Sequence, residues 1–216
     1  MDVDSIEMER YIEGHIDQEW SVLHNIYRRS HLELIGGRMA SGHLQGTILK
    51  MFTRMINPQN VLEIGTFTGY SAISIASGFM RPGAMLHTIE IDDELELFIR
   101  RSIAEAHYED RITLHIGDAT DVIPTLDCMF DMAFIDGNKR NYISDYELVM
   151  QRLNVGGYVI ADNVLWDGHV LTTPAPNDKQ TQGVIAFNDY VCSDSRVERV
   201  IIPVRDGLTI IRKMKN

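Results

Sequence analysis

The stretch Leu62–Ser71, LEIGTFTGYS, decides how this sequence folds. An apolar run leads into Gly65, and Gly69 follows four residues later, directly before a helix-like segment. Glycines here let the backbone turn tightly and approach a ligand, and the first turn of a helix offers free N–H groups. The stretch therefore predicts either a plain strand-to-helix turn or a cofactor site. Its E-x-G-x-x-x-G pattern differs from the G-x-G-x-x-G of dinucleotide-binding proteins, which argues against a nucleotide-dependent dehydrogenase.

A regular alternation of strands and helices surrounds this stretch. Apolar runs that are typical of strands occur at NVLEIG (60–65), AMLHTIEI (84–91), RITLHIG (111–117), FDMAFID (130–136) and GGYVIAD (156–162). Helices are expected between them, at about 70–77, 93–107, 119–126 and 139–153. Near-continuous apolar strands that alternate with helices indicate a parallel sheet that is buried on both faces.

The two ends of the chain depart from this alternation. RVERVIIPV (196–204) and LTIIRK (208–213) are separated only by RDG, and Asp-Gly is a strong hairpin-turn signal. The last two strands are therefore expected to be antiparallel. Residues 1–57 are expected to form an N-terminal helical cap, and residues 58–216 the core of the same α/β domain. The prediction is a mostly parallel seven-stranded sheet, whose ligands bind beyond the carboxyl ends of its strands.

The bulk properties exclude several classes of protein. The chain has 216 residues and a net charge of -11 at pH 7, which disfavours a broad face for nucleic acid. Its two cysteines, Cys128 and Cys192, lack C-x-x-C spacing, so neither a disulfide framework nor a thiolate zinc site is expected. No apolar stretch approaches the roughly 20 residues that span a bilayer, and the N-terminal residues lack the basic n-region and apolar h-region that are typical of a signal peptide. We therefore expect a cytoplasmic protein that does not bind membranes.

Polar residues follow the strands at their carboxyl ends. Glu90 ends the second strand, where a carboxylate can accept both ribose hydroxyls of a nucleoside or cap the next helix. Asp118 follows the third strand and could meet an adenine edge or cap a helix. Asp162 and Asn163 stand side by side after the fifth strand, where an Asx turn is the ordinary interpretation. The residues alone leave these alternatives open.

Taken together, the sequence resembles the S-adenosylmethionine-dependent methyltransferases of the class I, Rossmann-like fold, over about residues 36–216. Three segments resemble more narrowly the cation-dependent O-methyltransferases, the family of catechol and caffeoyl-CoA O-methyltransferases and their bacterial relatives. These segments are FIDGNKRNY (134–142), VIADNVLWDG (159–168) and VIIPVRDGLTIIRK (200–213). Their joint presence in this order is highly specific, whereas each segment alone is not.

The resemblance implies a divalent-cation site made by Asp136, Asp162 and Asn163. Oxygen ligands of this kind suit Mg²⁺ best, with Mn²⁺ or Ca²⁺ as alternatives, and suit zinc poorly. Lys139 matches the family's catalytic lysine, which is held to take the proton of the acceptor, so Lys139 and Asp136 form the expected catalytic pair. Such a cation is expected beside the cofactor because phenols are mostly protonated at pH 7, and a cation on two adjacent oxygens favours the ionised form.

The resemblance also implies an S-adenosylmethionine pocket and an acceptor site. The expected cofactor residues are Met39, Ser41, Glu63, Gly65, Thr66, Phe67, Gly69, Ser71, Glu90, Ile91, Asp118, Ala119 and Asp136. Ser41 and Ala119 depart from the valine and serine that are more usual in the catechol enzymes. Trp166, His43 and Lys139 are expected at the acceptor. The stretch Asp167–Gly183, long and polar with Pro174 and Pro176, is expected to be either a mobile lid or disordered.

The prediction is thus an O-methyltransferase that acts on a vicinal dihydroxy aromatic small molecule. One alternative keeps the chemistry but changes the acceptor: bacterial relatives with a similar ending methylate 5-hydroxyuridine in transfer RNA, and Arg28, Arg29 and Arg38 would supply a basic patch. A second alternative is a non-catalytic cofactor-binding protein. A homodimer is expected because the family is commonly dimeric, with the apolar helical N-terminus as a candidate interface.

Overall fold

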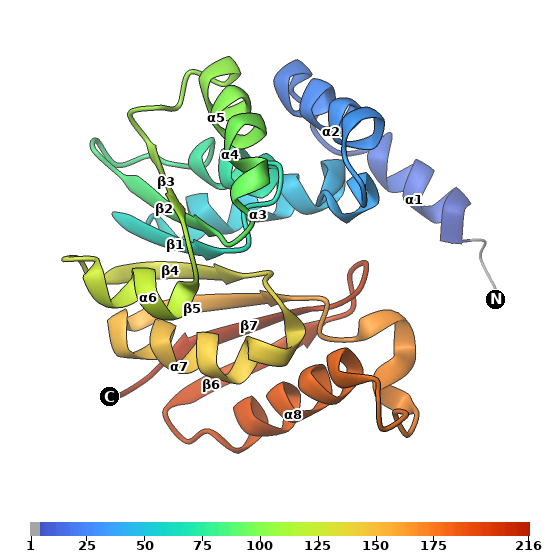
Figure 1. Ribbon diagram of the computed structural model, residues 1–216, viewed down its shortest axis with the longest axis vertical. Helices are drawn as coiled ribbons and strands as arrows, with labels where there is room; N and C mark the ends of the chain where they lie inside the picture. Colours follow the sequence, from blue (N-terminus) through green and yellow to red (C-terminus); the bar gives the residue numbers. More distant parts are fainter. Residues whose placement is uncertain (1–4) are drawn as a thin grey trace.

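The strand that leads into the glycine-rich stretch, β1 (Asn60–Ile64), lies inside the sheet with a parallel neighbour on each side. The computed structural model describes residues 5–216 and places seven strands in the order β3-β2-β1-β4-β5-β7-β6 (Figure 1). Strand β7 runs antiparallel to both β5 and β6, which confirms the predicted hairpin. The remaining strands are β2 (Met85–Glu90), β3 (Ile112–Ile116), β4 (Phe130–Ile135), β5 (Leu153–Asp162), β6 (Val197–Ile202) and β7 (Leu208–Lys213).

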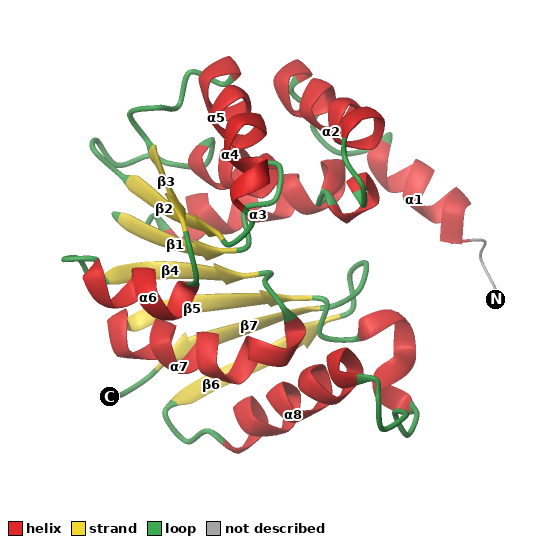
Figure 2. Cartoon of the chain, viewed as in Figure 1, coloured by secondary structure: helices red, strands yellow, loops and turns green. Residues whose placement is uncertain are grey.

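Helices cover both faces of the sheet (Figure 2). The earlier helices pack against one face of the sheet, in a core cluster that includes Val61 and Phe134. The later helices pack against the other face, in a cluster that includes Leu62 and Ile135. Adjacent strand residues therefore face opposite cores, as the pleat requires. The helices are α1 (Ser5–Glu13), α2 (Ser21–Glu33), α3 (Gly42–Ile56), α4 (Tyr70–Ala76), α5 (Glu96–Glu105), α6 (Ala119–Val122), α7 (Tyr142–Arg152) and α8 (Lys179–Ser193).

Short 3-10 turns account for the ends of several predicted helices. The four helices expected in the core are present, but three of them begin or end in such a turn. In the N-terminal part, residues 1–4 lie outside the described residues, and helices occupy much of the rest. The 3-10 segments are η1 (Gly37–Met39), η2 (Asp93–Leu95), η3 (Ile123–Thr125), η4 (Lys139–Asn141) and η5 (Trp166–Leu171).

The expected irregular stretch 167–183 is shorter than the sequence suggested. Helix α8 already begins at Lys179, and the Asp178 side chain accepts hydrogen bonds from the Thr181 backbone N–H at 3.1 Å and from Thr181 Oγ1 at 2.6 Å. The Asp178 side chain thus pairs a backbone N–H of the first helical turn that would otherwise lack a partner. This N-cap favours a helix start at Lys179, before the spacing of the apolar residues indicates a helix. Within the described residues, no helix is both long and apolar enough to cross a membrane.

The chain switches direction in the sheet between β1 and β4, so their carboxyl ends open a crevice. Gly65, directly after β1, has a φ of 96°, and a Cβ at this position would overlap the carbonyl oxygen of Asp136, directly after β4. Only glycine allows both this left-handed backbone and this close approach. The loops after these two strands therefore meet at the base of the crevice.

Candidate active site

A cavity of about 540 Å³ opens at the carboxyl ends of β1 to β5. Its size lies in the range of roughly 300–1,000 Å³ that is typical of small-molecule sites. Most of the residues that were expected to bind cofactor, metal or acceptor line its wall. They are Met39, Ser41, Gly65, Thr66, Phe67, Ser71, Glu90, Ile91, Asp118, Ala119, Asp136, Lys139, Asp162, Asn163 and Trp166.

Three expected residues lie outside the set that lines this cavity. Glu63 is fully buried and accepts a hydrogen bond from Thr88 Oγ1 at 2.5 Å. Gly69 has a φ of 80° and is the N-cap residue of α4, where it shapes the start of the helix. His43 Nε2 bonds to the main-chain carbonyl of Asp17 at 2.7 Å, which holds its ring against the N-terminal segment.

Glu90, the last residue of β2, is held in place by backbone donors. Its Oε2 accepts from the Phe67 N–H at 2.7 Å and its Oε1 from the Asp92 N–H at 3.0 Å. Phe67 has a φ of 50°, so the loop after β1 bends in order to reach this carboxylate. Each carboxylate oxygen has two lone pairs, so Glu90 can organise the loop and still bind two ligand hydroxyls.

Asp118 both caps a helix and borders the cavity. Its Oδ1 accepts hydrogen bonds from the Thr120 backbone N–H at 2.8 Å and from Thr120 Oγ1 at 2.6 Å, at the start of α6. These bonds lower the pKa of Asp118, because they favour the charged carboxylate. The two roles that the sequence left open are therefore compatible at this position.

Two carboxylates lie side by side where β4 and β5 end. Ile135 and Ala161 are paired across these parallel strands, and Asp136 and Asp162 are the residues that follow them. Burial, and then the charge of Asp136, raises the pKa of Asp162 to about 7. Asn163 follows with a φ of 56°, a left-handed conformation that asparagine tolerates better than most residues. A bound cation would offset the repulsion between the two carboxylates.

The donor set here fits a hard divalent cation. Asp136, Asp162 and Asn163 offer only carboxylate and amide oxygens, which Mg²⁺, Mn²⁺ and Ca²⁺ prefer. Across residues 5–216, no group of three or more His, Cys, Asp or Glu side chains is arranged to hold a metal. The set Asp136, Asp162 and Asn163 has only two carboxylates, and its third donor is an amide, so it does not count as such a group.

Lys139 lies at the junction of these strand ends. Its Nζ donates to Asp136 Oδ1 at 2.8 Å and to Tyr142 Oη at 2.6 Å. The Tyr142 hydroxyl donates in turn to the Asp162 carbonyl at 3.0 Å, and burial raises the pKa of this tyrosine well above its usual value. Lys139 Nζ is 5.9 Å from the centre of the Trp166 ring, so lysine and tryptophan border the same part of the cavity.

Sequence reasoning missed other residues of the wall, among them Gln45, Asp145 and Arg205. Gln45 is buried on α3 and donates to Asp162 Oδ2, although 117 positions separate the two residues. Its one sequence signal is an amide on the buried face of a helix. Arg205 lies in the turn between β6 and β7, a segment that the sequence marked only as a hairpin turn.

The sequence matches known proteins over most of its length. Residues 15–214 match the model of the O-methyltransferase family. Caffeoyl-CoA O-methyltransferase 2 of Populus trichocarpa is 32% identical over 185 residues, which cover 79% of this chain and 73% of that protein. Catechol O-methyltransferase domain-containing protein 1 of Mus musculus is 33% identical over 175 residues, which cover 79% of this chain and 66% of that protein.

Solved structures agree with this assignment. The O-methyltransferase from Bacillus cereus, in complex with SAH, has a TM-score of 0.88 and 25% identity, and the match covers 96% of this chain and 97% of that one. The O-methyltransferase TomG from Streptomyces achromogenes, involved in tomaymycin synthesis and solved with SAM, has a TM-score of 0.87 and 29% identity over 96% of each chain. The chain therefore belongs to the O-methyltransferase family, and is an O-methyltransferase with the class I fold of the S-adenosylmethionine-dependent enzymes.

Proposed function

We propose that this enzyme uses a divalent cation to transfer a methyl group from S-adenosylmethionine to one oxygen of a vicinal dihydroxy aromatic small molecule. One observation carries the proposal: a single cavity contains the glycine loop after β1, the carboxylate of Glu90 and the oxygen donors Asp136, Asp162 and Asn163. Relatives named for caffeoyl-CoA and catechol, and structures solved with SAM or SAH, support it.

The cofactor half of the proposal rests on the loops after the first three strands. Glu90 can bind the ribose hydroxyls, since backbone N–H groups hold both its oxygens at the cavity wall. Gly65, Thr66 and Phe67 line the cavity in the loop after β1, and this loop would face the amino-acid part of the ligand. S-adenosylmethionine, when bound, supplies a methyl group on a positively charged sulfur.

The acceptor half rests on the ends of β4 and β5. Asp136, Asp162 and Asn163 would hold the cation, which when bound favours ionisation of a coordinated hydroxyl and orients two adjacent oxygens. We assign Lys139 Nζ to receive the acceptor proton, because this buried amine lines the cavity beside Asp136. Trp166 offers an aromatic wall to the acceptor ring, next to the same amine.

The structure gives the transfer RNA alternative no specific support. The Arg29 guanidinium donates to both carboxylate oxygens of Glu105, each at 2.8 Å, and to Ser102 Oγ at 3.1 Å. The side chain of Arg38 lies outside the described residues. Since one member of the expected basic patch is engaged within the protein, we favour a small-molecule acceptor.

Labelled S-adenosylmethionine offered with catechol, phenol and hypomodified transfer RNA in parallel, with Mg²⁺ present, tests this function. We expect methyl incorporation into catechol and at least tenfold less into phenol, because phenol cannot chelate the cation. We expect none into RNA, since Arg29 of the expected basic patch is engaged within the protein. Asp162→Asn should abolish the catechol reaction, whereas Asp167→Asn, at an exposed acid nearby, should retain it. Preference for RNA would overturn the acceptor class, and cofactor binding without any turnover would favour a non-catalytic protein.

A further inference from the structure

Asp145 is a buried carboxyl group that the proposed reaction does not use. It lies near the start of α7, is only 4% exposed and lines the cavity. Its Oδ2 is 3.7 Å from the position that a Cβ on Gly137 would occupy, so it faces the loop after β4. Helix α7 also contacts α6, which Asp118 caps after β3. Asp145 therefore lies between the ends of β3 and β4.

Among the described residues, the Asp145 carboxyl group has no hydrogen-bond partner that would offset its burial. Burial first, and the charge of Asp118 second, raises its pKa to about 7, and no hydrogen bond from the described residues offsets either effect. Buried polar groups are nearly always paired, and one left without a partner costs stability. Asp162 is also buried but accepts hydrogen bonds from Gln45 and the Asn163 N–H. A ligand that brings an N–H donor would give Asp145 the same kind of partner.

The position of Asp145 indicates which part of a ligand would reach it. This step rests on the proposed methyl donor, with its ribose at Glu90 and its reacting methyl near Asp136 and Lys139. The base is attached to the far side of the ribose from the methyl, so it extends toward the end of β3, where Asp118 and Ala119 line the cavity. An adenine bound there could turn its exocyclic amine, a donor of two hydrogen bonds, toward this end of α7.

We propose that Asp145 accepts a hydrogen bond from the exocyclic amine of the donor's adenine, and so makes the site selective for an adenine base. The amine has two N–H donors, and no other described residue uses the acceptor oxygens of Asp145. Once ionised, the carboxylate only accepts, so a base with an oxygen in place of the amine would set two acceptors against each other and be rejected by the same contact. The stability that the protein loses by burying an unpaired carboxyl group is then offset by selectivity for the ligand.

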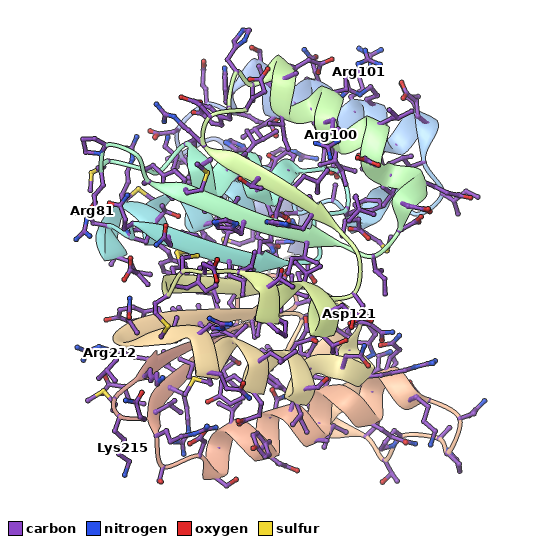
Figure 3. The ribbon with its side chains drawn as sticks, turned by 60° about the vertical axis from the view of Figure 1, so that its left-hand side comes forward. Arg81, Arg100, Arg101, Asp121, Arg212 and Lys215 are labelled. Atoms are coloured by element: carbon purple, nitrogen blue, oxygen red, sulfur yellow. The ribbon has the colours of Figure 1, made fainter. Side chains whose placement is uncertain are left out.

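Calorimetric titration at pH 9, where the Asp145 carboxyl group is ionised, of S-adenosylhomocysteine and of S-inosylhomocysteine, its 6-oxo analogue, tests this inference without turnover. The wild type should bind the adenosyl compound at least tenfold more tightly. Asp145→Leu should weaken adenosyl binding at least tenfold and remove the discrimination, yet melt at or above the wild-type temperature, because the buried carboxyl is gone. Asp145→Asn retains an acceptor oxygen and should bind within about threefold of wild type. Asp121→Asn on α6, an exposed acid labelled in Figure 3, serves as the unaffected control.

Equal affinity of the wild type for the two compounds would overturn the role of Asp145, as would tight adenosyl binding by Asp145→Leu. If Asp145→Leu fails to fold, the wild-type comparison and Asp145→Asn still decide. Failure of the wild type to bind either compound would instead overturn the methyl donor itself, and this inference with it. Lower stability of Asp145→Leu with unchanged affinity would indicate a purely structural residue.

Discussion

At the scale of single residues, Glu63 shows how a group behind the cavity wall can influence it. Glu63 is fully buried in β1, and burial is the main cause that raises its pKa to about 8. The nearby charges of Asp136 and Glu90 act in the same direction, while hydrogen bonds from Ser71 and Thr88 act against it. With a pKa of about 8, Glu63 is mostly protonated at neutral pH, and so adds little negative charge near Asp136.

This raised pKa predicts a pH dependence of stability. The folded protein holds the Glu63 proton up to about pH 8, whereas the unfolded chain releases it near its ordinary value of 4.5. The contribution to stability is thus fully present below pH 4.5 and is lost as pH rises through about 8, by at most roughly 5 kcal/mol.

Urea unfolding of the wild type and Glu63→Gln at pH 5, 7 and 9 measures this effect. The free energy of unfolding of the wild type should fall relative to that of Glu63→Gln across this range, since glutamine does not titrate. A difference that stays constant with pH would show that Glu63 is ionised in the folded protein.

The site residues that sequence could reveal are those at strand ends. Asp136 and Asp162 follow apolar runs, so their place at the carboxyl edge of the sheet follows from chain order. Gln45 and Asp145 lie on helices, where side-chain direction depends on how the helix packs. Their contribution to the cavity follows from tertiary packing that no local pattern encodes.

At the scale of elements, the turn between β6 and β7 supports the segment that follows β5. The Leu165 N–H donates to the Asp206 carbonyl at 2.9 Å, and the Asp167 N–H donates to Asp206 Oδ1. Trp166 and Asp167 have φ values of 48° and 49°, which cost energy for residues other than glycine. The hairpin turn therefore helps to hold a strained segment that places Trp166 at the cavity.

Asp206→Ala should loosen this segment without disturbing the cofactor loops. Loss of one hydrogen bond is worth about 0.5–1.5 kcal/mol, so KM for the acceptor should rise by roughly twofold to tenfold. Affinity for S-adenosylhomocysteine should stay unchanged, because its expected contacts come from the other end of the cavity. Steady-state kinetics and calorimetry, with the exposed Asp110→Ala as control, check this split. If Asp206→Ala weakened the binding of S-adenosylhomocysteine as much as that of the acceptor, the turn would not have the role assigned to it.

The elements themselves were predicted to different degrees. The antiparallel terminal hairpin follows from Asp-Gly between two apolar runs, but β6 ends at Ile202, which pairs with Leu208, so the turn is longer than RDG alone. Helix α8 was not predicted in the stretch 167–183, because two prolines and a polar composition suggested a loop up to Gly183. Asp178 with Thr181 three residues later is a capping signal that would have placed its start.

At the scale of the molecule, the N-terminal helices and the sheet build one site. Alternation along the chain predicts the parallel strands and their number, but not which helix will close the crevice. The structure shows α3 against the sheet, with Gln45 bonded to Asp162 of β5 (Figure 1). Met39 and Ser41, just before α3, line the same cavity. The helical cap is therefore part of the candidate active site.

We propose that methyl transfer requires a divalent cation held by Asp136, Asp162 and Asn163. This requirement is measured as the initial rate of catechol methylation by chelator-treated wild-type enzyme, before and after Mg²⁺ is added back. Chelation should lower the rate by at least about 100-fold, because the cation would supply both ionisation and orientation of the acceptor, and Mg²⁺ should restore it. An unchanged rate in chelator would show that Asp136, Asp162 and Asn163 do not act through a cation.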